Sequence, residues 1–271
     1  MRYGVDRAMM TAGIATAPVE RLVEHALARA AVYRLLGAAL AYPVPGTLGE
    51  LGALAEAAAG GPVVGDVLAS ALRRLAAEAR AADAAALAQE HVFLFDRQVR
   101  CAPHEGAYGD APRMAGKGAL LADIAGFYAA FGLGPAAARP DTEDHIAAEL
   151  EFMSALALKE AYALAEANAD GLDVTRRAES AFLTDHLGRW GEAFADAVRE
   201  ATPLPYFGAV AECLAGWIRR EVTALGATPA RVGPERGRDP LQEDALSCPM
   251  APDGTEPDSG AAPLAQGPSI P

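Results

Sequence analysis

Residues 141–153 read Asp-Thr-Glu-Asp-His-Ile-Ala-Ala-Glu-Leu-Glu-Phe-Met, and they are the most strongly patterned stretch of the chain. Ile146, Leu150 and Met153 recur at helical spacing, so they form an apolar stripe along one side of a helix. His145 lies on a second face beside that stripe. The pattern predicts a helix with one face that packs and another that can bind.

An acid and an imidazole, Asp144 and His145, stand together where this helix begins. An aspartate at a helix start accepts hydrogen bonds from first-turn amides, which is worth about 1 kcal/mol. The residues alone therefore favour Asp144 as a helix N-cap and leave ligand binding by the pair as the alternative. Glu149 and Glu151, further along, are interpreted in the first place as a solvated or ion-paired face.

The composition predicts an all-α protein. The chain has 271 residues, of which 52% are hydrophobic but only 6% aromatic, and much of the excess is alanine, the best helix former. Strand-like alternation bounded by turns is not found. The expected helices are about 19–41, 47–59, 64–82, 83–95, 114–131, 143–168, 173–200 and 206–225.

These helices predict a single helical-bundle domain over residues 18–226, with Pro18 at the start of the first helix. Residues 1–17 are expected to be a flexible N-terminus. Residues 227–271 contain nine of the 19 prolines, with glycine, serine and aspartate between them. They are predicted to form a disordered tail whose removal leaves stability unchanged.

The charge balance excludes some classes of partner. With 23 lysines and arginines against 36 acidic residues, the net charge of −13 opposes binding to nucleic acid and favours a basic peptide. We expect no membrane span, because no run of 18 apolar residues occurs. The three cysteines include no Cys-x-x-Cys pair, so a reducing cytoplasm is the expected location.

Metal and catalytic chemistry are weakly indicated. His145 with Glu149, and Cys101 with His104, have spacings that could share an ion, but a zinc site needs three or four protein ligands. We therefore predict no metal, no cofactor and no catalytic residue. Cys101 and His104 keep open one alternative, a Cys/His-dependent enzyme.

Four segments, taken in order, resemble the TorD/DmsD/NarJ family of molybdoenzyme assembly chaperones. The resemblance covers roughly residues 20–222, and the chain differs from the family pattern at Glu143 where proline is usual, at His104 where an aromatic residue is common, and at Gly106 where serine is common. The matching residues are Phe93, Leu94 and Phe95; Ala102, Pro103, Glu105 and Tyr108; Asp144, His145, Ile146, Glu149, Leu150, Glu151, Phe152 and Met153; and His186, Leu187 and Trp190.

The resemblance implies a TorD-like bundle of about eight helices that acts as a cytoplasmic chaperone and not as an enzyme. Its partner would be the catalytic-subunit precursor of a molybdopterin-containing oxidoreductase related to dimethylsulfide dehydrogenase or to selenate, chlorate or nitrate reductase. The contact would include the twin-arginine signal peptide, the mature chain or both, and molybdenum cofactor delivery proteins would be further partners. A purely structural helical adaptor is a second alternative. The residues that the resemblance assigns to peptide or client binding are Phe93, Phe95, Pro103, His104, Glu105, Tyr108, Asp144, His145 and Glu149.

Overall fold

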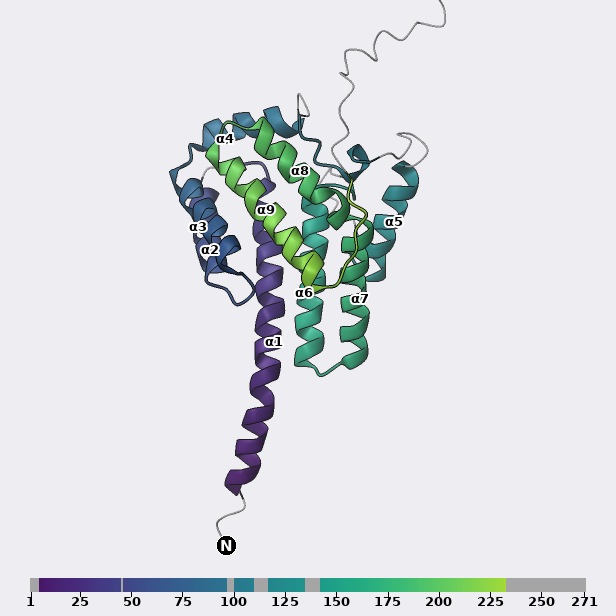
Figure 1. Cartoon of the computed structure of the whole chain (residues 1–271). Helices are drawn as coiled ribbons and strands as arrows, with labels where there is room; N and C mark the ends of the chain where they lie inside the picture. Colours follow the sequence, from purple (N-terminus) through teal and green to yellow (C-terminus); the bar gives the residue numbers. More distant parts are fainter. Residues whose placement is uncertain (1–4, 45, 97–99, 110–116, 135–141, 233–271) are drawn as a thin grey trace, which may run out of the picture. The chain divides into compact units, whose positions relative to one another are not determined.

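The structure is a computed structural model that describes residues 5–44, 46–96, 100–109, 117–134 and 142–232, with side chains from residue 18 onward. These residues belong to one compact unit, Met1–Glu235. Helices make up its regular structure (Figure 1). The elements are α1 (Val5–Leu40), α2 (Thr47–Ala59), α3 (Asp66–Ala81), α4 (Ala84–His91), the π-helical turn η1 (Val92–Asp96), the 3₁₀ turn η2 (Glu105–Ala107), α5 (Lys117–Ala130), α6 (Ile146–Ala165), α7 (Ala169–Asp185), α8 (Leu187–Ala201) and α9 (Pro205–Ala224).

The all-α prediction is confirmed, because the described residues contain nine α-helices and no strand beyond an isolated bridge between His104 and His145. The predicted helix over residues 173–200 is wrong, since it is two helices, α7 and α8, that meet at His186. A Cβ atom at Gly188 would lie 2.2 Å from the carbonyl oxygen of Leu183, so only glycine fits this tight junction. Helical periodicity continues across the junction, and for that reason the sequence did not reveal it.

The predicted start of the first helix at Pro18 is also wrong. Helix α1 begins at Val5 and continues through Pro18. Proline fixes φ at a helical value, so a helix can pass through it at the cost of one backbone hydrogen bond. The flexibility of residues 1–17 stays a prediction.

The core forms where α1 and α6 pack side by side and α8 and α9 cover them (Figure 1). Helices α1 and α6 are antiparallel, because Ser154 Oγ donates to the carbonyl of Ala30 at 2.9 Å while Gly37 packs against Ala147. The largest fully buried side chains are Trp190, Trp217, Tyr33, Phe182, Phe194 and Phe207. Each contributes about 2–3 kcal/mol of hydrophobic stabilisation.

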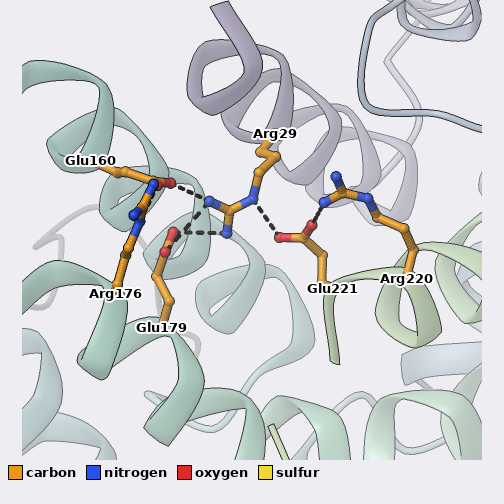
Figure 2. Close-up of polar contacts among 6 residues, drawn as sticks. All are labelled: Arg29, Glu160, Arg176, Glu179, Arg220 and Glu221. Carbon is orange, nitrogen blue, oxygen red and sulfur yellow. Dashed lines mark hydrogen bonds and ion pairs between the residues drawn. The ribbon is translucent and has the colours of Figure 1, made fainter. Parts of the chain in front are cut away.

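A buried ionic network, which we call the Arg29 cluster, joins α1, α6, α7 and α9 (Figure 2). The Arg29 guanidinium of α1 pairs with Glu160 of α6, with Glu179 of α7 at 2.9 Å and with Glu221 of α9 at 2.9 Å. Arg176 and Arg220, at the edge of the cluster, pair with Glu160 and Glu221. Three carboxylates are thus balanced by three guanidinium groups, as a buried charge requires.

The chain continues from α9 across the bundle as an extended segment, residues 227–232, which we call the strap. Ala227 is buried, the Thr228 amide donates to Thr184 Oγ1 at 3.1 Å, and the Val232 amide donates to the Arg189 carbonyl at 3.0 Å. The prediction of a disordered tail from residue 227 is therefore wrong for these six residues. Residues 233–271 lie outside the described part of the chain.

Within the described residues, no helix is both long enough and apolar enough to cross a membrane.

Candidate functional site

The structure brings loop 101–109 against the start of α6, so two of the segments singled out in the sequence form one surface. The Ile146 amide donates to the Pro103 carbonyl at 2.8 Å, and the Glu105 amide donates to the Asp144 carbonyl at 2.9 Å. The rings of His104 and His145 pack edge to face, with centroids 5.1 Å apart. Residues about forty positions apart in sequence are thereby fixed to each other through backbone hydrogen bonds.

Asp144 is fully buried and holds this junction together. Its carboxylate accepts hydrogen bonds from the Gly106 amide at 3.2 Å and from Thr142 Oγ1, and it lies 3.3 Å from His104 Nδ1. Burial alone would raise the pKa of Asp144, but the hydrogen bonds from His104, Thr142 and Gly106 lower it to about 2. Asp144 is therefore ionised and fully occupied by contacts within the chain.

The N-cap of α6 is His145 and not Asp144, so that sequence prediction is wrong. The Ala147 amide donates to His145 Nδ1 at 3.2 Å. Its imidazole therefore satisfies one of the first-turn amides, the part that sequence reasoning assigned to Asp144.

Glu105 of the loop and Glu149 of α6 are also buried. Glu105 lies 3.0 Å from His186 Nδ1, and Arg189 is 3.8 Å from its other oxygen. Glu149 Oε2 accepts a hydrogen bond from Trp190 Nε1 at 3.2 Å. Burial first, and then the negative charge of Glu105, raise the pKa of Glu149 well above its usual value. The burial of Glu149 contradicts its interpretation as part of a solvated face.

The His186 ring lies between the carboxylates of Glu105 and Asp123 and makes a hydrogen bond with Glu105 only, among the described residues. Its Nε2 atom lies 3.4 Å from Asp123 Oδ2, yet that nitrogen makes no hydrogen bond within the described residues. The two atoms are close, but a hydrogen bond also needs near-linear geometry, which this contact lacks.

The three aromatic residues of the predicted site have different surroundings. Phe95 packs edge to face on His91, with centroids 4.9 Å apart. Tyr108 packs on Trp190 and donates its hydroxyl to the Ala102 carbonyl at 3.1 Å, which ties the loop to the core. The ring of Phe93 lies under the Arg100 guanidinium at 4.3 Å.

Beside the loop lies a cavity of about 550 Å³, which we call the apolar groove. It is bounded by the end of α1, the turn that follows α1, η1, Pro103 of the loop and the first turn of α6. Most of its walls are aliphatic or aromatic, and Glu151 is the only carboxylate among the described residues that line it. The lining residues are Arg34, Gly37, Ala38, Leu40, Ala41, Tyr42, Val44, Thr47, His91, Phe95, Pro103, His145, Ile146, Ala147, Glu151 and Phe194.

The groove has a polar end and an apolar end. Because α1 and α6 are antiparallel, Arg34 and Glu151 fall at the same end. Tyr42 and Val44 stand at the other, and both are more than half exposed. An opening of this size with exposed aromatic and aliphatic walls can hold a few apolar side chains of a peptide.

The predicted site residues lie in, beside or outside the lining of the apolar groove. Phe95, Pro103 and His145 line the apolar groove. His104 stacks on His145 beside it and is about one third exposed. The remaining residues, Phe93, Glu105, Tyr108, Asp144 and Glu149, lie outside the groove lining, and the three acids among them are buried behind it.

The sequence did not identify four lining residues, Arg34, Tyr42, Val44 and Glu151, as a site. Tyr42 and Val44 directly follow the expected helix 19–41, in a turn that contains Pro43. The available signal was the presence of two large side chains, Tyr42 and Val44, in a proline-containing turn, because turns usually lie at the surface.

The geometry weighs against nucleophilic chemistry at Cys101. This side chain is 1% exposed, and burial raises the pKa of its thiol to about 11. The thiol is therefore protonated at neutral pH, whereas a nucleophilic cysteine acts as the thiolate. His104 is engaged with Asp144 and Thr142 rather than with Cys101. Among the described residues, no group of three or more histidines, cysteines or acids is placed to hold a metal ion.

A comparison with protein families finds a match over residues 64–196 to the family described as nitrate reductase delta subunit. The match spans just under half of the chain and includes η1, loop 101–109, the start of α6 and the α7–α8 junction. It supports this family in broad terms. No curated protein matches the chain significantly.

Proposed function

We propose that this chain is an assembly chaperone of the nitrate reductase delta subunit family, and that it binds a molybdoenzyme catalytic-subunit precursor through the apolar groove. The matched family is a family of molybdoenzyme assembly chaperones. One observation carries the proposal: the matched region supplies Phe95, Pro103 and His145, and all three line one groove with exposed apolar walls.

The groove has the chemistry of a peptide site that reads apolar side chains first. Its lining includes Gly37, which has no side chain, and Ala38 and Ala41, which have only a methyl group, so another backbone can approach closely. Glu151 brings negative charge to one end of the groove. An apolar client segment next to a basic residue fits this arrangement, in the mode in which an amphipathic segment lies in a groove.

Both a twin-arginine signal peptide and a segment of the mature chain can offer that pattern. In this proposal the buried acids Glu105, Asp144 and Glu149 shape loop 101–109 and do not grip the client's arginines themselves. Phe93, His104 and Tyr108 hold the loop against the bundle. The apolar walls then supply most of the affinity, and the negative charge of Glu151 adds long-range attraction for a basic segment.

The chaperone would hold the precursor in the cytoplasm until the molybdopterin cofactor is inserted and export is permitted. Molybdenum cofactor delivery proteins would be transient partners of the complex. The client would be a nitrate reductase-like enzyme or a relative that reduces selenate or chlorate or oxidises dimethylsulfide. The chain itself would perform no catalysis, which agrees with the protonated, buried Cys101.

The proposal is tested with the full chain and the N-terminal precursor region of a molybdoenzyme catalytic subunit from the same organism. Calorimetry is expected to show saturable 1:1 binding to the precursor and at least tenfold weaker binding to the folded, cofactor-loaded enzyme. Equal affinity for both forms would indicate a structural adaptor instead. If no catalytic subunit of the organism binds, the chaperone assignment is wrong.

A further inference from the structure

The strap ends against the far side of the loop that contributes Pro103 to the groove. Gly109 adopts a φ of +91°, a backbone conformation that residues other than glycine rarely adopt. Its α-carbon faces the Val232 side chain. A Cβ atom at Gly109 would lie 3.2 Å from Val232 Cγ1, tighter than ordinary van der Waals contact. Val232 therefore packs directly on the loop backbone, and a methyl group at position 109 would force its side chain to shift.

The strap is fixed at both of its ends to other elements. At its start, the Ala227 amide donates to the Val222 carbonyl at 3.0 Å, and Thr228 is hydrogen-bonded to Thr184 of α7. At its end, the Val232 amide is bonded to the Arg189 carbonyl of α8. Arg231 also forms an ion pair with Glu192 at 2.8 Å, but its guanidinium is more than half exposed, so this pair contributes little to the hold on the strap.

Arg189 connects the strap to the loop a second time. Its carbonyl accepts the Val232 amide, and its guanidinium lies 3.8 Å from Glu105 of the loop. Pro229 packs beside Gly188 at the junction of α7 and α8, next to His186, which pairs with Glu105 from the other side. The strap thus packs on the α7–α8 junction, whose His186 in turn contacts Glu105 of the loop.

We propose that residues 227–232 are a positioning device for loop 101–109, with Val232 and Gly109 as its contact point. The strap limits the backbone motion of the loop, so Pro103 and His104 stay in the register that completes the groove. A loop that samples many conformations must be ordered when a client binds, which weakens affinity. This inference rests on the proposed function for its effect on client binding, but the hold on the loop is independent of any client.

Two truncations of the full chain separate the strap from the residues beyond it. Removal of 233–271 retains the strap, and removal of 227–271 deletes it. Hydrogen exchange at the Gly106, Ala107 and Tyr108 amides, which are bonded to Asp144, His104 and Glu105, reports on the loop. We expect exchange there to accelerate at least tenfold without residues 227–271 and to be unchanged without residues 233–271.

Point variants guard against a truncation that unfolds. Val232→Ser is expected to accelerate exchange at the same three amides, whereas Arg231→Ala, which removes only an exposed ion pair of the strap, is the matched control and should not. Gly109→Ala is made alone and together with Val232→Ala. The strain from the positive φ is common to both backgrounds, so a smaller acceleration in the double variant isolates the contact between the two residues.

The client supplies the second readout. Val232→Ser is expected to weaken precursor binding about fivefold, and Arg231→Ala to leave it unchanged. Unchanged exchange at the loop amides in Val232→Ser would overturn the proposal, and so would faster exchange with undiminished client affinity. If the wild-type chain binds no precursor at all, the proposed function fails, while the exchange data still decide whether the strap holds the loop.

Discussion

Helix α1 carries two arginines, five residues apart, in opposite environments. Arg29 is buried and pairs with three glutamates from three other helices. Arg34 is exposed at the polar end of the apolar groove and has no ion pair with a described residue. The same side chain therefore holds four helices together at one position and lies exposed at a surface proposed for recognition at the other.

This difference separates charge that specifies the fold from charge that can specify a partner. A buried ion pair repays its desolvation only with good geometry and additional hydrogen bonds, and a charge left alone in the interior is costly. An exposed charge contributes little to stability and acts mainly on encounter with a charged partner. The Arg29 cluster and the groove should thus respond in opposite ways to mutation, pH and salt.

The largest expected effect is the loss of the buried cation. Arg29→Met leaves Glu160, Glu179 and Glu221 without their shared partner and is expected to lower the free energy of unfolding by about 3–5 kcal/mol. Arg34→Met, the matched control on the same helix, should change it by less than about 0.5 kcal/mol. Urea unfolding followed by far-UV circular dichroism measures both. Similar losses in the two variants would mean that the cluster is no more structural than the surface.

The next effect is a pH dependence that originates in the Arg29 cluster. Burial, opposed by Arg29, raises the pKa of Glu179 from 4.5 to about 7. An acid with a raised pKa in the folded state stabilises the fold fully below its unfolded pKa and loses that contribution as pH rises through the folded pKa. This residue should therefore make the protein less stable at pH 8 than at pH 5, by on the order of 3 kcal/mol.

Glu179→Gln is expected to remove that share of the pH dependence while the fold persists. Urea unfolding of both proteins at pH 5, 6, 7 and 8 provides the comparison, because contributions from other groups cancel in the difference between them. A difference that does not change with pH would show that Glu179 is ionised throughout this range.

At the groove, a change of side chain should affect the client and not the fold. Tyr42→Ala removes an exposed aromatic wall of the groove and is expected to weaken precursor binding about tenfold, or about 1.4 kcal/mol. Tyr162→Ala, on α6 and outside the groove lining, is the matched control, since Tyr42 is 56% and Tyr162 67% exposed. Calorimetry measures affinity and thermal unfolding measures stability. Equal losses of affinity in the two variants would place the client elsewhere.

The smallest expected effect concerns the carboxylate at the polar end of the groove. Glu151→Gln should slow association with a basic precursor peptide about threefold at low salt, and the difference should shrink at physiological salt, where charges are screened beyond about 8 Å. Glu166→Gln, at the other end of α6, is the control. Stopped-flow association at two salt concentrations is the measurement. A constant difference at both salt concentrations would argue against long-range steering by Glu151.

Much of the fold could be predicted because helices depend on local pattern. The predicted helix at residues 47–59 has the observed bounds of α2, and α9 was displaced by one residue. The break at His186 was missed because it depends on the close approach of Gly188 to Leu183 across a continuous apolar pattern. The Arg29 cluster could not be predicted either, since Arg29 and Glu221 are 192 positions apart.

The site was predictable only in part. The motif residues lie in loop 101–109 and at the start of α6, which the structure brings together, but the motif does not show which side chains are accessible. The resemblance assigns Asp144, Glu105 and Glu149 to client binding, and the structure buries all three. The exposed walls, Tyr42 and Val44, carry no polar chemistry that a motif search would notice.

Site-specific photocrosslinking in native cells tests the central claim most directly. A photoreactive phenylalanine analogue is placed at position 42 in one variant and at position 162 in another. The two variants compare an exposed position in the groove with an exposed position outside it. The account predicts that position 42 crosslinks to the catalytic-subunit precursor of a molybdoenzyme and that position 162 does not. Crosslinking of that precursor from position 162 but not from position 42 would contradict it.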